Sequence, residues 1–171
     1  DQWAEDRFIC AHAIMLALEG IPGIYIHSLL ATENDLAGLE RSGHNRAINR
    51  RQWDFGEICG FLDSDDNLHG RVYRRLIRLM VLRRQQVAFH PNATQFTLHL
   101  GNSLFGFWRQ STNRRQSIFC IYNVTRTAQE LCLSDINLID TDAWYDLVND
   151  QPVGDLDATI TIRPYQGLWI T

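Results

Sequence analysis

Arginine, amide and carboxylate side chains gather in one segment of the chain, residues 27–56. Its polar members include Asn34, Asp35, His44, Asn45, Arg46, Asn49 and Arg50. A planar guanidinium presents forked donors that can hold a sugar hydroxyl or an anion. All sixteen basic residues of the chain are arginine, which excludes a lysine Schiff base and a phosphate-loop lysine. The residues therefore predict a polar binding loop. The alternative is a solvated loop whose charges face water, and composition alone favours it.

The elements that lead into this segment are a helix and a short apolar strand. Apolar residues at three- and four-residue steps predict a helix over residues 2–19. Gly20 ends that helix and Pro22 prevents its continuation. Residues 21–26 follow, apolar at nearly every position, which is typical of a strand covered on both faces in a parallel sheet. In parallel α/β barrels, binding groups lie in loops at the carboxyl ends of such strands, and residues 27–56 occupy that position.

A parallel strand needs parallel neighbours, and the sequence offers no second strand of this type. Either the neighbours belong to sequence outside this chain, or another copy of the chain supplies them. The first residues already read as part of a helix, so we expect a piece of a longer protein. If the remainder is absent, the apolar faces of residues 8–30 are uncovered, which predicts self-association or disorder there.

Beyond the polar segment, the helical period returns. A short helix is predicted between Glu33 and Glu40, a turn at 61–69, and a helix at about 69–88 that ends before Pro91. Its expected buried positions are Val72, Leu76, Leu79, Met80 and Val87, and its expected solvent face carries Arg71, Arg74, Arg75 and Arg78. That face does not indicate nucleic acid, because the chain carries a net charge of −4.

After Pro91 the pattern changes to short alternating runs separated by turn residues. The predicted strands cover residues 96–100, 104–108, 117–122, 129–133, 143–148, 159–162 and 167–170. Regularly spaced short strands of this kind predict an antiparallel sandwich. The expected division is therefore an α/β part at 1–90 and an all-β domain at 91–171.

Three short sequence segments carry a resemblance to a known family. Gly20-Ile21-Pro22-Gly23-Ile24-Tyr25, followed by Glu33-Asn34-Asp35-Leu36 and Asn45-Arg46-Ala47-Ile48-Asn49-Arg50, resembles the last barrel strand and following loop of the α-amylase family, glycoside hydrolase family 13. The match is closest to the sucrose phosphorylase branch, whose loop ends in Gly-Arg-Asp-Ile-Asn-Arg. Residues 144–147 and 162–169 are similar to the last strands of that family's C-terminal β domain, so the resemblance covers essentially the whole chain.

The resemblance implies a fold and a reaction. The fold is the last strand and helices of a TIM barrel, followed by an antiparallel C-terminal domain. The reaction is retaining α-glucosyl transfer from sucrose or a related α-glucoside to phosphate, through a covalent glucosyl-enzyme. In the family, the nucleophile, the acid and the stabilising aspartate lie on earlier barrel strands. This chain therefore holds no catalytic residue and is expected to be inactive alone.

One functional residue carries over by the motif. The first arginine of the Arg-x-Ile-Asn-Arg pattern is Arg46, which the resemblance places on the 4-hydroxyl of the glucosyl unit; a structural salt bridge is the alternative. Arg50 is the second candidate for substrate binding, or a loop anchor, and Tyr25 is expected to pack at the strand end. Ala47 replaces the branch's aspartate, which leaves the acceptor open. Residues 27–30 lack the Gly and Glu of many amylases, which favours the phosphorylase branch.

The remaining signals point to no cofactor and no membrane. Cys10, Cys59, Cys120 and Cys132 form no zinc-ligand spacing and are expected to be free thiols, and the six histidines show no metal-like pairing. No signal peptide or spanning run is visible, so a cytoplasmic location is expected. A competing hypothesis is a non-catalytic β-sandwich that binds carbohydrate or protein through Trp108, Trp144 and Trp169. We expect these tryptophans to pack in a core or interface instead.

Overall fold

The computed structural model describes residues 2–64 and 66–171, and these form two compact units. One unit joins the residues up to Pro22 with Leu79–Thr171, and the other is Gly23–Arg78. These bounds differ from the expected division at residue 90, because the first helix packs with the β strands. Asp65, in the predicted turn at 61–69, lies outside the described residues.

The predicted first helix is present as α1, Ala4–Ala17, and its apolar face packs against β3 (Ser117–Asn123) and β8 (Gly167–Ile170). The Tyr122 hydroxyl donates to the carbonyl of Ala13 at 3.1 Å. Gly20 follows with φ +99°, a conformation that glycine adopts without steric cost. The first helix is therefore a covering layer of the sheet.

The predicted antiparallel β domain is confirmed. Six strands form one sheet in the order β1-β2-β3-β8-β5-β6, and β4 and β7 form a second, two-stranded sheet. The strands not yet defined are β1 Thr94–Leu98, β2 Leu104–Gln110, β4 Gln129–Cys132, β5 Trp144–Asp146, β6 Gln151–Gly154 and β7 Thr159–Ile162. Every pairing is antiparallel. All seven predicted strands are present, whereas β6 was not predicted; Pro152 lies in it, and an edge strand tolerates proline.

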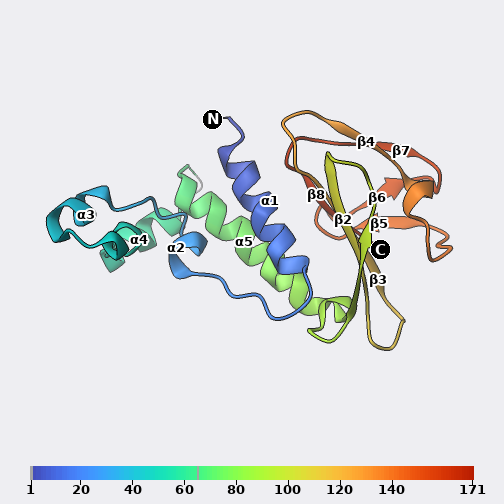
Figure 1. Ribbon diagram of the computed structural model, residues 1–171, viewed down its shortest axis with the longest axis horizontal. Helices are drawn as coiled ribbons and strands as arrows, with labels where there is room; N and C mark the ends of the chain where they lie inside the picture. Colours follow the sequence, from blue (N-terminus) through green and yellow to red (C-terminus); the bar gives the residue numbers. More distant parts are fainter. Residues whose placement is uncertain (1, 65) are drawn as a thin grey trace. The chain divides into compact units, whose positions relative to one another are not determined.

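Figure 1 shows the strands around β3 between α1 and the β4–β7 pair, and buried side chains lie on both faces of β3. Phe119 and Ile121 join Leu131 and Ile162 of the β4–β7 pair, together with Trp144. The alternate residues of β3 face α1, so nearly the whole strand is buried. The sandwich is thus closed on one side by a small sheet and on the other by a helix. The 3-10 turn η3, Leu133–Ile136, adds Leu133 and Ile136 to the core.

The predicted strand at residues 21–26 is absent. Residues 21–25 run without regular structure, and Ile26 begins a single helical turn, α2 (Ile26–Leu29). Ile21 is 84% exposed. The physical reason is that a strand of this type needs parallel neighbours. In the described part of the chain, every strand pairs with antiparallel partners in the two sheets, and none is available to residues 21–26.

Four further elements complete the polar segment and the following helix. They are α3 Leu36–Ser42, the 3-10 helix η1 Asn45–Asn49, α4 Phe55–Leu62 and α5 Leu68–Gln85. The short helix predicted at 33–40 forms slightly later, as α3. The long helix ends earlier than predicted, and a 3-10 turn, η2 (Val87–Phe89), follows it. Val72, Leu76 and Leu79 are buried as expected, but Val87 is 57% exposed because it lies beyond the helix.

The C-terminal end of α1 is held by two arginines from distant parts of the sequence. Arg109 of β2 is fully buried and donates to the carbonyls of Ala17 at 2.8 Å, His90 at 3.0 Å and Ala93 at 3.3 Å. Arg83 of α5 donates to the carbonyls of Leu16 at 2.7 Å and Gly20 at 3.0 Å. Burial lowers the pKa of both guanidiniums, which still remain charged at neutral pH. Positive charge here complements the negative end of the helix dipole.

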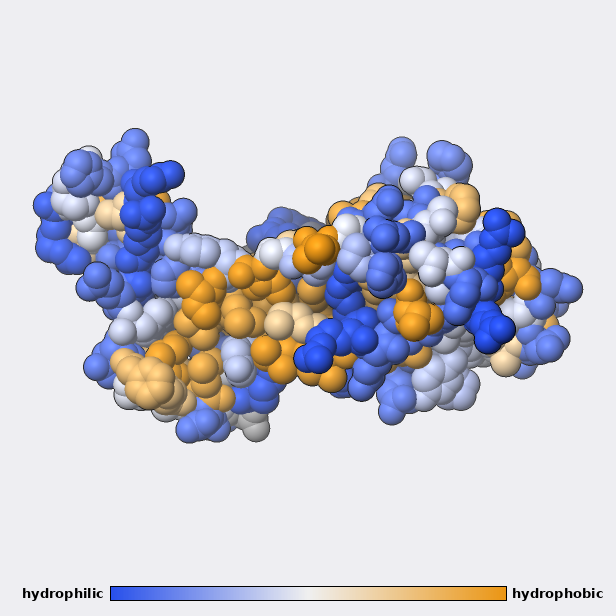
Figure 2. Space-filling model, turned by 90° about the horizontal axis from the view of Figure 1, so that it is seen from below, coloured by the Kyte–Doolittle hydropathy of each residue, from blue (hydrophilic) through white to orange (hydrophobic). Residues whose placement is uncertain are grey.

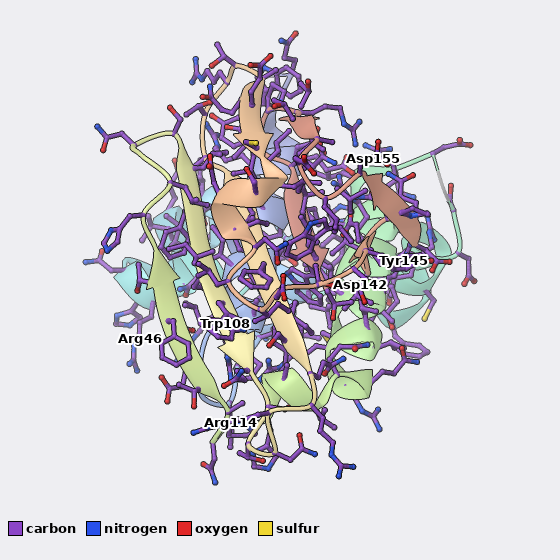
Figure 3. All side chains as sticks on the ribbon, turned by 90° about the vertical axis from the view of Figure 1, so that its right-hand side faces the viewer. Arg46, Trp108, Arg114, Asp142, Tyr145 and Asp155 are labelled. Atoms are coloured by element: carbon purple, nitrogen blue, oxygen red, sulfur yellow. The ribbon has the colours of Figure 1, made fainter. Side chains whose placement is uncertain are left out.

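Replacing Arg109 with methionine should lower the free energy of unfolding by about 2–4 kcal/mol, because it leaves buried carbonyls without donors. Urea denaturation measures this loss. Arg114→Met is the matched control, since Arg114 is an exposed arginine in the turn between β2 and β3 (Figure 3). Equal stability of the two variants would contradict the capping role.

A buried carboxylate closes the junction of β5 and β8. Asp146 is 1% exposed and accepts from the amides of Val148 at 3.0 Å and Trp169 at 3.1 Å, and from the side chain of Asn149. Burial raises the pKa of Asp146 despite these donors. A carboxyl whose folded pKa exceeds its unfolded value, about 3.9, stabilises the fold most when it is protonated. That contribution is lost as pH rises through the folded pKa.

Asp146→Asn removes this titration, and the Asn149 amide can turn over to accept from the new amide. The stability of the variant relative to wild type should therefore improve as pH rises from about 3.5 to 7. Urea denaturation at several pH values measures the difference. Asp155→Asn, at an exposed position labelled in Figure 3, should show a smaller change. A difference for Asp146→Asn that does not vary with pH would be the contrary result.

Candidate binding loop

Backbone and side-chain hydrogen bonds hold η1 next to α3. The amide of Asp35 donates to the carbonyl of Ile48 at 2.6 Å, and the Asp35 carboxylate caps α3 by accepting from the amide of Gly38 at 2.8 Å. The Tyr25 hydroxyl donates to the carbonyl of Asn49 at 2.9 Å. Tyr25 was predicted to pack at a strand end, but its side chain is half exposed. Through its hydrogen bond to Asn49 it anchors the loop instead. These contacts fix the backbone that carries Arg46.

A second group of contacts, centred on Trp53, holds the end of the loop. The indole nitrogen of Trp53 donates to Thr32 Oγ1 at 2.9 Å, and His27 Nδ1 lies 3.2 Å from the same oxygen. The guanidinium carbon of Arg51 lies 3.9 Å from the Trp53 ring centroid, a cation–π arrangement. His69 packs edge-on to Trp53, and its Nδ1 lies 2.7 Å from the carbonyl of Leu30. Because Nδ1 faces a carbonyl, it carries the proton there.

The loop encloses an open cavity of about 960 Å³. Its charged and titratable lining is Asp35, Arg41, His44, Arg46, Arg50 and Arg51. Arg46 lies in η1 and Arg50 directly follows it, and both are exposed. The structure therefore brings the two predicted binding residues to one cavity.

The lining is strongly positive for a chain with a net charge of −4. Four arginines face it with a single carboxylate, Asp35, which already caps α3. Within residues 2–64 and 66–171, the guanidiniums of Arg41, Arg46 and Arg50 have no hydrogen-bond or ion-pair partner. Such groups can donate to hydroxyls or oxyanions without first breaking an internal contact.

Sequence reasoning missed two members of this lining, Arg41 and Arg51. Arg51 lies next to Arg50 and two residues before Trp53, and an arginine close to a tryptophan is a signal for a cation–π pair. Arg41 lies in the last turn of α3, and its helix was predicted to end before it. Arg41 could be placed at the cavity only once it was known that α3 extends to Ser42.

The three tryptophans proposed for a stand-alone binding module do not form an exposed platform. Trp169 is fully buried, and its indole nitrogen donates to the Tyr122 hydroxyl at 2.7 Å. Trp144 is 2% exposed. Trp108 of β2 is half buried and stacks on Phe119 with ring centroids 5.6 Å apart. These tryptophans therefore pack in the core, as the sequence analysis expected, and do not form a surface for binding carbohydrate.

No group of three or more histidine, cysteine, aspartate or glutamate side chains among the described residues is placed to hold a metal ion. The described helices include none that is long and apolar enough to cross a membrane. The four cysteines are free; Cys10 and Cys120 are buried, and burial raises the pKa of Cys10 to about 11.

Comparison with known proteins identifies the class of protein. No protein-family model matches the chain. Among solved structures, AmyP bound to maltose superimposes with a TM-score of 0.77 at 13% identity, over 97% of this chain and 34% of AmyP. At that identity the likeness shows the fold, which is one found in α-amylase-family enzymes.

Curated relatives then specify the branch. The chain is 36% identical to glucosylglycerate phosphorylase of Escherichia coli K12, over 96% of this chain and 28% of that enzyme. It is 29% identical to sucrose phosphorylase of Bifidobacterium adolescentis, over 67% of this chain and 21% of that enzyme. The chain belongs to the α-amylase family, on the branch that contains these phosphorylases. It spans about three tenths of the length of the first of these relatives.

Proposed function

We propose that the chain is the C-terminal portion of a retaining α-glucosyl-transferring enzyme, one that moves a glucosyl unit from an α-glucoside to phosphate. The relatives at 36% and 29% identity are phosphorylases, which supports phosphate as the acceptor. The observation that carries the proposal is the open arginine cavity behind the Arg46–Arg50 motif. In this proposal, residues 21–26 become the last strand of a barrel when the remaining strands are present.

The proposed reaction needs two carboxyl groups and a sugar-positioning group. A carboxylate attacks the anomeric carbon, and an acid protonates the leaving oxygen; phosphate then displaces the carboxylate, so the configuration is retained. We assign neither carboxyl group to this chain. Its contribution is Arg46, which donates to the 4-hydroxyl of the glucosyl unit and keeps the anomeric carbon in line with the nucleophile. Arg50 is the second substrate-binding residue.

Arginine suits that position for a physical reason. A guanidinium can donate to a hydroxyl through one edge and to a carboxylate through another, and lysine does not reproduce this planar geometry. The fixed backbone of η1 means that little ordering is needed when a sugar arrives. The proposal for Arg46 therefore rests on its motif, its open cavity and its anchored backbone.

A chimera tests the role of Arg46. The matching segment of the E. coli glucosylglycerate phosphorylase is replaced with this chain, and release of α-glucose 1-phosphate from glucosylglycerate and phosphate is followed by NMR. Arg46→Gln should lower kcat/KM about ten- to a hundredfold, the range expected for one charge-assisted hydrogen bond. Arg114→Gln should leave kcat/KM unchanged. A chimera that is folded by circular dichroism and active, but insensitive to Arg46→Gln, would remove Arg46 from the site.

The chain alone should be inactive with sucrose and phosphate, because neither carboxyl group of the reaction is assigned to it. Glucose 1-phosphate released by the isolated chain would contradict this.

The chain alone should also self-associate. Figure 2 shows apolar side chains gathered at the surface, and Ile21 at 84% and Phe55 at 81% are the most exposed large apolar residues among those described. Light scattering after size exclusion should show dimers or larger species, and Ile21→Asp should reduce them. Val124→Asp, at an exposed apolar residue that follows β3, is the control. A monodisperse monomer would be the contrary outcome.

A further inference from the structure

The proposed function gives Arg46 a contact with the sugar and names Arg50 as a substrate-binding residue without saying which group it binds. Arg41 and Arg51, the other two arginines at the cavity, have no role there. We propose that Arg41, Arg50 and Arg51 form an oxyanion-binding site next to Arg46, which takes the phosphate or carboxylate group of a small molecule. This proposal rests on the proposed function only because both place a ligand at the same loop. The proposed function concerns a sugar hydroxyl at Arg46, whereas this proposal concerns an anionic group.

Positive charge is concentrated at the cavity, although the chain as a whole is not basic. The chain as a whole is acidic, yet the lining of this cavity carries four guanidiniums and one carboxylate. The acidic residues nearest in sequence are Glu33, Glu40, Asp54 and Glu57, and none of them lines the cavity. Asp54 instead caps α4 by accepting from the amide of Glu57 at 2.9 Å. An anion bound among these guanidiniums would be attracted by all of them.

The cavity lining offers more hydrogen-bond donors than acceptors. A neutral polyol both donates and accepts, so sites for it combine both kinds of group. Here the four arginines supply donors only, the one carboxylate already accepts at the α3 cap, and the amide oxygens of Asn45 and Gln52 are the other side-chain acceptors of the lining besides Ser42 and His44. Donors therefore outnumber acceptors, and an oxyanion, which chiefly accepts, matches that excess. Its small size also fits a local cluster, whereas a nucleic acid would need an extended basic surface.

Parts of the oxyanion site are held in place before any ligand binds. Arg51 stacks on Trp53, which is itself fixed by its hydrogen bond to Thr32. Arg41 is carried by α3, whose start is capped by Asp35. Arg50 follows η1, and its amide donates to the carbonyl of Ala47 at 3.1 Å. Fixing these backbones in advance reduces the entropy lost on binding.

Calorimetric titration of the 171-residue chain tests the site directly. The probes are inorganic phosphate, glycerate as a carboxylate, and glycerol as the neutral counterpart. We expect one equivalent of phosphate or glycerate to bind, no measurable binding of glycerol, and weaker binding as salt increases. Arg41→Gln, Arg50→Gln and Arg51→Gln should each weaken oxyanion binding about tenfold, and Arg114→Gln should leave it unchanged.

The outcomes separate this site from the proposed function. Binding of phosphate alone assigns the site to a phosphate, and binding of glycerate alone assigns it to a carboxylate; each supports the proposal. No binding of either, equal binding of glycerol, or the same weakening in Arg114→Gln overturns it. Near-ultraviolet circular dichroism confirms that each variant is folded. Because no sugar is present, oxyanion binding can succeed while the Arg46 chimera fails, and the reverse can also occur.

Discussion

The capping of α1 by Arg83 and Arg109 is the constraint on which the β unit depends. A helix ends with carbonyls that lack intrahelical donors, and at the end of α1 they point into a region where Arg109 has no exposed surface. Two guanidiniums donate to these carbonyls and, through Arg109, also to the carbonyls of His90 and Ala93. The last turns of α5, the turn before β1 and the strand β2 are thereby joined to one helix end. An apolar side chain at either position would bury these carbonyls without partners.

The sequence predicted the β unit well because its signals are local. Alternation identifies a half-buried strand from a few residues, and all the predicted strands are present. The missed strand, β6, contains Pro152, which argues against a strand unless its place at a sheet edge is known. The capping of α1 was not predictable, since Arg109 and Ala17 are 92 positions apart. Nothing in the local pattern distinguishes a buried arginine from a solvated one.

Residues 21–26 show the opposite failure, in which a local apolar pattern predicted a strand that the structure does not contain. Six mostly apolar residues in a row describe a strand buried on both faces, but a strand is defined by its partners. With no parallel partner among the described strands, the segment is irregular and Ile21 is exposed. α4 was missed for a different reason. Its capping pair, Asp54 and Glu57, is a recognisable start signal that was absorbed into a segment read as a loop.

Some residues of the candidate site could be predicted from a local motif, and others depend on how the chain folds. Arg46 and Arg50 were predicted as binding residues because a motif fixes their spacing, and one 3-10 turn brings both to the same cavity. Arg41 and Arg51 belong to the same cavity through the α3 boundary and the Trp53 stack, which a motif does not encode. The loop is held by backbone carbonyls and hydroxyls, chiefly those of Ile48, Asn49 and Thr32, so its arginines are not consumed in holding it. In a loop stabilised by salt bridges, these guanidiniums would already be paired with carboxylates. In this loop they remain available for a ligand.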